Sequence, residues 1–217
     1  MLVKTKRYVK KRYNEPSRVF EFYSQGFRTF LPQSLIEDFD TLVCNELNER
    51  RRYWQTALEK TDMTWRHAEN PYEAFKDRCY DEARLREVEE LDFLAAELSA
   101  LGLYRFLEIE RGRVLIEHLP SLDPTRLSSI TYLNKAIPIL RRCFGADAID
   151  ELRLICNCIK HSGRVSSSLA RCHSSWQEGE RLTPLRTALE RIAPFIGAYW
   201  VDLLYRLAEE FPVSRSM

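Results

Sequence analysis

Polar side chains that could do chemistry on an anionic group gather within a short stretch near the middle of the C-terminal half. On a helix, at about 100° per residue, Arg153, Asn157 and Lys160 fall on one narrow face. Asp150 and His161 lie at the border of that face. Histidine titrates near neutral pH and can carry a proton, while arginine and lysine can hold a phosphate. The stretch is therefore our candidate site.

The element that must position these residues is a helix. We predict that it begins with Asp147 as its N-terminal cap and ends near His161, where a Ser-Gly pair opens the backbone. Leu152, Ile155 and Ile159 form the opposite stripe and are expected to face a core. The polar cluster is then exposed where the helix stops.

Two further helices are predicted in the first half of the chain. A capping box at residues 34–37 opens one, and Asn70 with Pro71 at the first helical position opens another that runs towards Gly102. Their expected apolar stripes are Leu35, Phe39, Leu42, Val43 and Leu47 in the first, and Phe75, Cys79, Val88, Leu91, Leu94, Ala95 and Leu98 in the second.

Residues 103–119 allow two interpretations. A continuing helix suits the apolar spacing, but an Arg-Gly-Arg sequence at 111–113 between two apolar triplets could also turn a hairpin. We favour the helix because the surrounding segments are helical.

Proline and glycine residues indicate the helix boundaries after residue 119. Asp123-Pro124 is predicted to open a helix as far as Gly145, with Pro138 kinking or splitting it. Residues 164–168 read as a connection or a short turn of helix. Thr183-Pro184 opens a long C-terminal helix that Pro194 should bend.

Composition agrees with a helical protein. The chain has 217 residues, 45% of them apolar and 30% charged, and only 7 glycines. Such a chain can bury a full core, and few glycines favour helices over a sandwich or barrel. We expect an all-α fold, a single up-and-down helical bundle with a kinked C-terminal helix over residues 14–217. A basic arm at residues 1–13 precedes it.

The order of residues around the candidate helix resembles the HEPN superfamily. Tyr132-Leu133 precedes an apolar helix to Phe144-Gly145, and Asn157, His161 and Gly163 match the polar position, the histidine and the trailing glycine of its motif. The similarity covers roughly residues 130–165, with a weaker echo at 103–108. The resemblance implies a HEPN-like core over about residues 71–211.

Members of that superfamily are small helical bundles, many of them ribonucleases of toxin–antitoxin and phage-defence systems, and they commonly pair as dimers. The resemblance implies a metal-independent endoribonuclease without a cofactor, with His161 transferring a proton, Arg153 and Lys160 holding the phosphate and Asn157 orienting the group. The alternative is an inactive HEPN-like module that dimerises and binds RNA or a protein partner.

This chain departs from the family pattern at one position. Cys156 stands directly before Asn157, where the family usually has arginine, and Arg153 is separated from His161 by seven residues. Arg153 is one helical turn before Asn157, so its long side chain can reach the same face. Lys160 is a second candidate for the cationic role.

The expected partners follow from charge and targeting signals. A net charge of +1 leaves RNA binding to local patches. The chain has six scattered cysteines, no secretory signal and no long apolar run, so we expect a soluble cytoplasmic protein without a membrane partner. An antitoxin or another defence protein is a further expected partner. Weaker candidates for RNA contacts are Lys4, Lys6, Arg7, Lys10, Lys11, Arg12 and Arg164.

The sequence disfavours a zinc site and a nucleophilic serine. Zinc is disfavoured because Cys156 and Cys158 point about 200° apart on a helix. A nucleophilic serine among residues 166–168 lacks the Gly-x-Ser-x-Gly turn that exposes such a group. We therefore expect no metal site.

Overall fold

The computed structural model describes residues 33–64 and 69–211, with side chains described from residue 41 onward. Over these ranges the chain is helical and contains no strand, which confirms the all-α expectation. The elements are α3 (Gln33–Thr64), α4 (Pro71–His118), η2 (Pro124–Arg126), α5 (Ile130–Ala136), η3 (Pro138–Arg141), α6 (Ala146–His161), α7 (Ser167–Cys172) and α8 (Leu185–Glu210). None of the described helices is long and apolar enough to cross a membrane.

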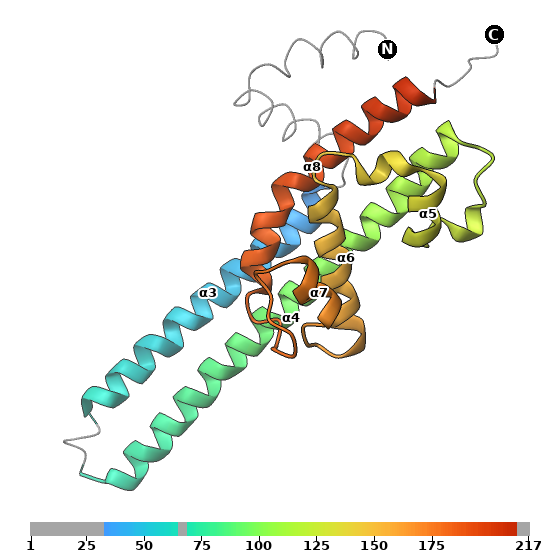
Figure 1. The fold of residues 1–217 in the computed structure, drawn as a ribbon. Helices are drawn as coiled ribbons and strands as arrows, with labels where there is room; N and C mark the ends of the chain where they lie inside the picture. The colour runs from blue at the N-terminus through green and yellow to red at the C-terminus, as the bar shows by residue number, and fades with distance from the viewer. Residues whose placement is uncertain (1–32, 65–68, 212–217) are drawn as a thin grey trace. The chain divides into compact units, whose positions relative to one another are not determined.

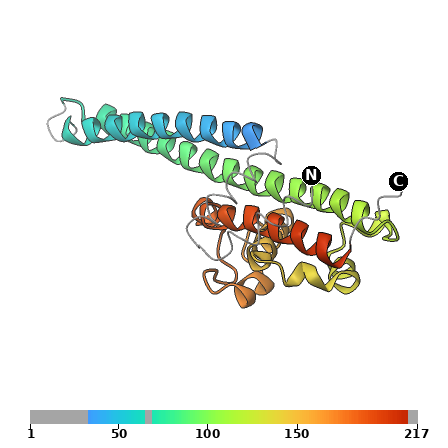
Figure 2. The ribbon, with the colours of Figure 1, turned by 90° about the horizontal axis from the view of Figure 1, so that it is seen from above.

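Contacts divide the chain into two compact units. One comprises residues 34–99, and the described part of the other comprises residues 100–211. The first is a helical hairpin, in which α3 runs antiparallel beside the first part of α4 (Figures 1 and 2). Leu47, Val88 and Ala95 are its buried apolar contacts, and Trp54 packs against them half-buried.

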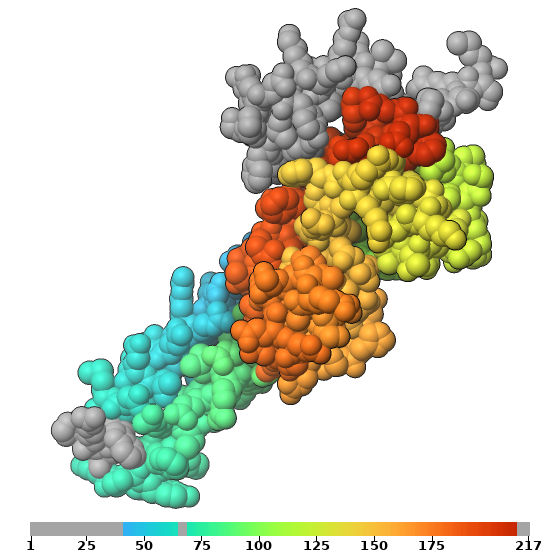
Figure 3. All heavy atoms as spheres, in the orientation of Figure 1, coloured from blue at the N-terminus to red at the C-terminus, as the bar shows by residue number. Residues whose placement is uncertain are grey.

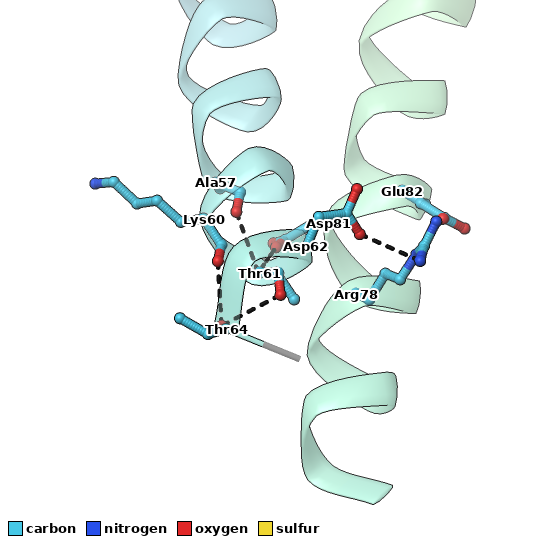
Figure 4. A network of polar contacts seen from close by, with 8 residues as sticks. All are labelled: Ala57, Lys60, Thr61, Asp62, Thr64, Arg78, Asp81 and Glu82. Atoms are coloured by element: carbon cyan, nitrogen blue, oxygen red, sulfur yellow. Dashed lines mark hydrogen bonds and ion pairs between the residues drawn. The ribbon is translucent and has the colours of Figure 1, made fainter. Parts of the chain in front are cut away.

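Polar contacts hold the hairpin together near its loop (Figure 4). The Thr61 hydroxyl lies 2.8 Å from a carboxylate oxygen of Asp81 and donates to it across the two helices. Arg78 on α4 forms an ion pair with Asp62 on α3 at 3.2 Å. These pairs fix the register of α3 against α4 where few apolar side chains meet.

The larger unit has the main core. Helix α6 packs against α8 and α7, and η3 packs against α5, α6 and α8. In the space-filling view, α7 and the segment after it form one continuous mass, drawn in orange (Figure 3). The large side chains that are fully buried there include Leu115, Leu133, Ile137, Ile139, Leu152, Ile155, Leu169, Leu182, Leu185, Ile192, Ile196 and Leu203.

Several predicted helices are confirmed. Helix α4 begins at Pro71 with the Asn70 side chain accepting from the backbone N–H of Tyr72 at 3.1 Å, and it continues to His118. The helical interpretation of residues 103–119 is therefore correct, and the hairpin alternative is not. Helix α8 begins at Leu185 and continues through Pro194.

The helix predicted from Asp123 to Gly145 is interrupted, and of the two effects expected of Pro138, a kink or a split, the structure shows the split. Asp123 caps only the short η2, a second start at Ser129 opens α5, and Pro138 begins η3 after α5 has ended at Ala136. A proline inside a helix removes one backbone donor and clashes with the preceding turn, so the chain breaks there instead of bending.

The predicted cap of α6 is also corrected. Helix α6 begins at Ala146 with Gly145 as its N-cap, and Asp147 lies within the first turn. Gly145 has a φ of 80°, which side-chain-bearing residues rarely adopt. A Cβ at this position would also collide with the carbonyl oxygen of Phe195 on α8. The glycine therefore lets the start of α6 approach α8 closely.

The apolar stripe predicted on the second helix divides into two sets. Val88 and Ala95 are buried against α3, but Phe75, Leu91, Leu94 and Leu98 are exposed. Leu42, placed in the stripe of the first helix, is also exposed. Periodicity identifies an apolar row but does not say whether another element covers it.

Candidate functional site

The two faces of helix α6 differ in exposure towards its C-terminal end. Leu152, Ile155 and Cys156 are fully buried on the inner face, as expected for the first two. Asn157 and His161, one turn apart, are exposed on the outer face. The sequence prediction that this polar face is open to solvent at the last residue of the helix is consistent with these positions.

Three candidate side chains at this end form no hydrogen bond or ion pair with the described residues. Asn157, Lys160 and His161 are exposed, and none forms a hydrogen bond or ion pair with any residue in the described ranges. We call these three residues the α6 end face. An exposed histidine, cation and amide without a hydrogen bond or ion pair to the described residues are available to a ligand from solvent.

Arg153 is engaged elsewhere. Its guanidinium forms a two-point contact with Asp150, with Nε at 2.9 Å and Nη2 at 2.8 Å from the same carboxylate oxygen. Asp150 lies three residues towards the start of α6, whereas His161 is eight residues further on, about 12 Å along the axis. The ion pair must open before Arg153 can serve a phosphate beside His161.

Cys156, at the position where the resembling family has arginine, faces the interior. Its side chain is buried, its Sγ lies 3.4 Å from the carbonyl oxygen of Ala100 on α4, and burial raises the pKa of the thiol to about 12. A neutral buried thiol supplies neither a cation nor a nucleophile. Arginine at this position would have to enter the core.

The connection after α6 is fixed by backbone contacts. Gly163 has a φ of 64° and donates to the carbonyl oxygen of Cys158 at 2.9 Å, which closes the helix. Arg164 forms a backbone bridge with Arg181, and its guanidinium donates to the carbonyl oxygen of Gly179 at 2.9 Å. Arg164 is exposed and follows His161 by three residues.

A polar cluster around one buried carboxylate lies on another side of α6. Glu151 is only 2% exposed, and its carboxylate accepts from Trp176 Nε1 at 2.7 Å and from Arg191 at 2.6 and 2.9 Å. His173 Nδ1 lies 3.7 Å from the same carboxylate. Burial alone disfavours the charged form, but the hydrogen bonds from Arg191 and Trp176 outweigh it and lower the pKa of Glu151. The cluster joins α6 to α8 and to the segment after α7.

A second buried charge is less well matched. Arg111 is 2% exposed, and its Nε and Nη2 find no hydrogen-bond partner among the residues that the structure describes. Burial raises the pKa values of two tyrosines, Tyr104 and Tyr199, the second to about 12. The positive charge of Arg111 opposes this effect at both hydroxyls. Neither the Glu151 cluster nor the group around Arg111 was predicted from the sequence. The signal that could have indicated the first is Glu151 itself, a charged residue among the apolar residues of α6.

The other candidate residues give little support for a functional site. Lys4, Lys6, Arg7, Lys10, Lys11 and Arg12 lie outside the described residues. Ser166 caps α7, and its backbone N–H donates to Cys158 Sγ at 3.3 Å. Within residues 41–64 and 69–211, no three His, Cys, Asp or Glu side chains are grouped so that they could hold a metal ion.

Comparison of the chain with protein-family models, with curated proteins and with solved structures finds no match. The residues themselves and the resemblance around Asn157 and His161 are therefore the grounds for assigning a function.

Proposed function

We propose that this protein is a HEPN-like, metal-independent endoribonuclease that acts at the α6 end face. The observation that carries the proposal is the unengaged His161 at the last residue of α6, one turn from Asn157 and beside Lys160. An exposed imidazole can transfer a proton at a phosphodiester, and an adjacent cation can stabilise the charge that develops on the phosphate.

The proposed reaction uses the 2′-hydroxyl of the RNA as the nucleophile. A base removes the 2′ proton, the 2′ oxygen attacks phosphorus, and the bond from phosphorus to the 5′ oxygen breaks as that oxygen receives a proton. His161 carries one of these protons, Lys160 stabilises the charged phosphorane, and Asn157 orients the substrate. Arg153 joins them when its ion pair with Asp150 opens.

One histidine can serve as either base or acid, but both roles are needed in one turnover. We therefore propose that two copies of the chain bring two α6 end faces to one RNA. The cytoplasm is the proposed compartment, because no two of the six cysteines, all within the described ranges, are joined by a disulfide. A toxin or phage-defence effector, held in check by a protein partner, is the proposed biological setting.

A second candidate is an RNA-binding module that does not cleave. Two observations favour it: the ion pair of Arg153 with Asp150, and the burial of Cys156 at the family's arginine position. In this module Lys160, Arg164 and the basic residues of the 1–13 arm would contact phosphates, and no group would drive the transesterification.

The deciding experiment incubates the purified full chain with labelled RNA in the presence of a chelator. Cleavage should leave a 2′,3′-cyclic phosphate and a 5′-hydroxyl, and a single 2′-deoxy substitution at the cut position should abolish it. His161→Ala should remove cleavage, and Lys160→Ala should weaken it, while Lys135→Ala, the same change at an exposed lysine of α5, should leave it unchanged.

The outcomes separate the candidates. Cleavage that survives in His161→Ala would overturn the proposed site, and RNA binding with no cleavage by the unchanged chain would establish the second candidate. Sedimentation across the concentration range of the assay tests the dimer, because activity should fall as the dimer dissociates.

A further inference from the structure

The first half of α4 has a second apolar row besides the one that faces α3. Leu91, Leu94 and Leu98 are 40%, 48% and 52% exposed. Their spacings of three and four residues are those of the a and d positions of a heptad. Since α3 already packs on Val88 and Ala95, this exposed row is a separate seam of the hairpin.

The seam continues towards the start of α4 in the same heptad register. Glu87 and Arg84 occupy the next two positions and form an ion pair at 2.6 Å, and the exposed Tyr80 follows, with the Arg84 guanidinium 5.2 Å from its ring centre. From Tyr80 to Leu98 the seam is about 27 Å long. It therefore presents about five turns of helix, with an apolar half and a polar half. This difference between the halves sets the orientation of any helix that binds along the seam.

The two borders of the seam differ. On one side Val88 and Ala95 are closed off by α3. On the other side the flanking heptad positions are Glu90 and Glu97. The whole hairpin is acidic, because residues 34–99 contain 17 Asp and Glu against 9 Lys and Arg, a net charge of −8 in a chain whose total is +1.

We propose that this seam, Tyr80 to Leu98, docks an amphipathic helix of another protein whose apolar row is flanked by lysine or arginine. Leucines of that helix would cover Leu91, Leu94 and Leu98, and its basic flank would face Glu90 and Glu97. The inference is independent of the proposed ribonuclease activity, because it involves none of the residues of the α6 end face.

Charge argues against a second copy as the occupant. In an antiparallel pairing of two such seams, the flanking glutamates of one copy would face those of the other, and like charges across a coiled-coil interface disfavour pairing. A basic helix removes this repulsion and gains an attraction that salt weakens.

The test uses two fluorescent synthetic helices of the same length with leucine at the heptad positions, one flanked by lysine and one by glutamate. Fluorescence anisotropy measures their binding to the full chain. We expect the lysine-flanked peptide to bind at least about tenfold more tightly at low salt. Leu94→Gln should weaken that binding by about tenfold, whereas Met63→Gln, at a 78% exposed position of α3, should not change it.

Each other result overturns the proposal. Equal binding of the two peptides would show that the glutamates do not select the partner, and binding unaffected by Leu94→Gln would place the peptide elsewhere. A chain dimer that Leu94→Gln dissociates, measured by sedimentation, would identify a second copy as the occupant. Peptide binding that appears only after residues 1–32 are removed would identify the chain's own N-terminal segment. Circular dichroism of both variants verifies that their helical content is unchanged.

Discussion

Asp150 holds Arg153 by two contacts to one carboxylate oxygen, a single turn apart on α6. The pair is partly exposed, so its net contribution to stability is small and it can open at little cost. Asp150 therefore competes with any RNA phosphate for the one arginine on the polar face of α6, and this competition determines how much Arg153 contributes to the proposed site.

Replacing Asp150 by asparagine should release Arg153. We expect Asp150→Asn to increase the affinity for labelled RNA by up to about fivefold beyond the effect of a lost negative charge, since a partly exposed ion pair is worth up to about 1 kcal/mol. Asp147→Asn removes the same charge from the first turn of α6 and is the matched control. Equal affinities of the two variants in a binding titration would mean that Arg153 does not contact RNA.

The Glu151 cluster predicts an acid-dependent stability. Because the folded state lowers the pKa of Glu151, the ionised carboxylate stabilises the fold above the unfolded pKa of about 4.3, and this contribution is lost as the pH falls through the folded pKa. Glu151→Gln should cost about 1–2 kcal/mol of unfolding free energy at pH 7, a value reduced because Arg191 is half exposed.

Denaturant titrations at several pH values verify this prediction. The difference between wild type and Glu151→Gln should shrink as the pH falls below the unfolded pKa of about 4.3 and through the lower pKa of Glu151 in the folded state. Glu190→Gln, at an exposed position of α8, should give no such convergence. A difference that stays constant with pH would mean that the charge of Glu151 is not what stabilises the cluster.

The turn before α6 should not tolerate a side chain. Gly145→Ala combines an unfavourable positive φ with a collision against the backbone of Phe195, so it should lower the free energy of unfolding by at least about 2 kcal/mol. Gly163→Ala also has a positive φ but has no atom within 4 Å of the new Cβ, and should cost only about 1 kcal/mol. Similar losses in thermal or denaturant unfolding would show that α8 yields to the new methyl group.

Arg111 should be replaceable without loss of stability. A buried guanidinium with two unpaired nitrogens carries a desolvation cost, so Arg111→Met, which keeps the volume, should leave the melting temperature unchanged or raise it. Arg111→Ala should lower the melting temperature, because it leaves a cavity. A marked loss in Arg111→Met would show that the contacts with Tyr104 and Tyr199 outweigh the desolvation cost.

Local sequence patterns predicted the features that depend on neighbouring residues. The Asn70-Pro71 start and the Ser-Gly end after His161 correspond to the ends of α4 and α6. The outward position of Asn157 follows from helical period alone. The Asp123 start signal was equally local, but it produced only three residues of 3₁₀ helix. A start signal gives no information about how far a helix continues.

Helical periodicity in the sequence was enough to predict the helices of the described ranges and a polar face of α6 that includes Asn157 and Lys160, with His161 at its border. Tertiary structure alone decided that Glu151 meets Arg191, 40 residues away, and that Leu91, Leu94 and Leu98 have no covering element among the described residues while Val88 does. The physical reason is that burial and charge pairing depend on which elements meet in space, and the apolar spacing within one helix is the same whether or not another helix covers it.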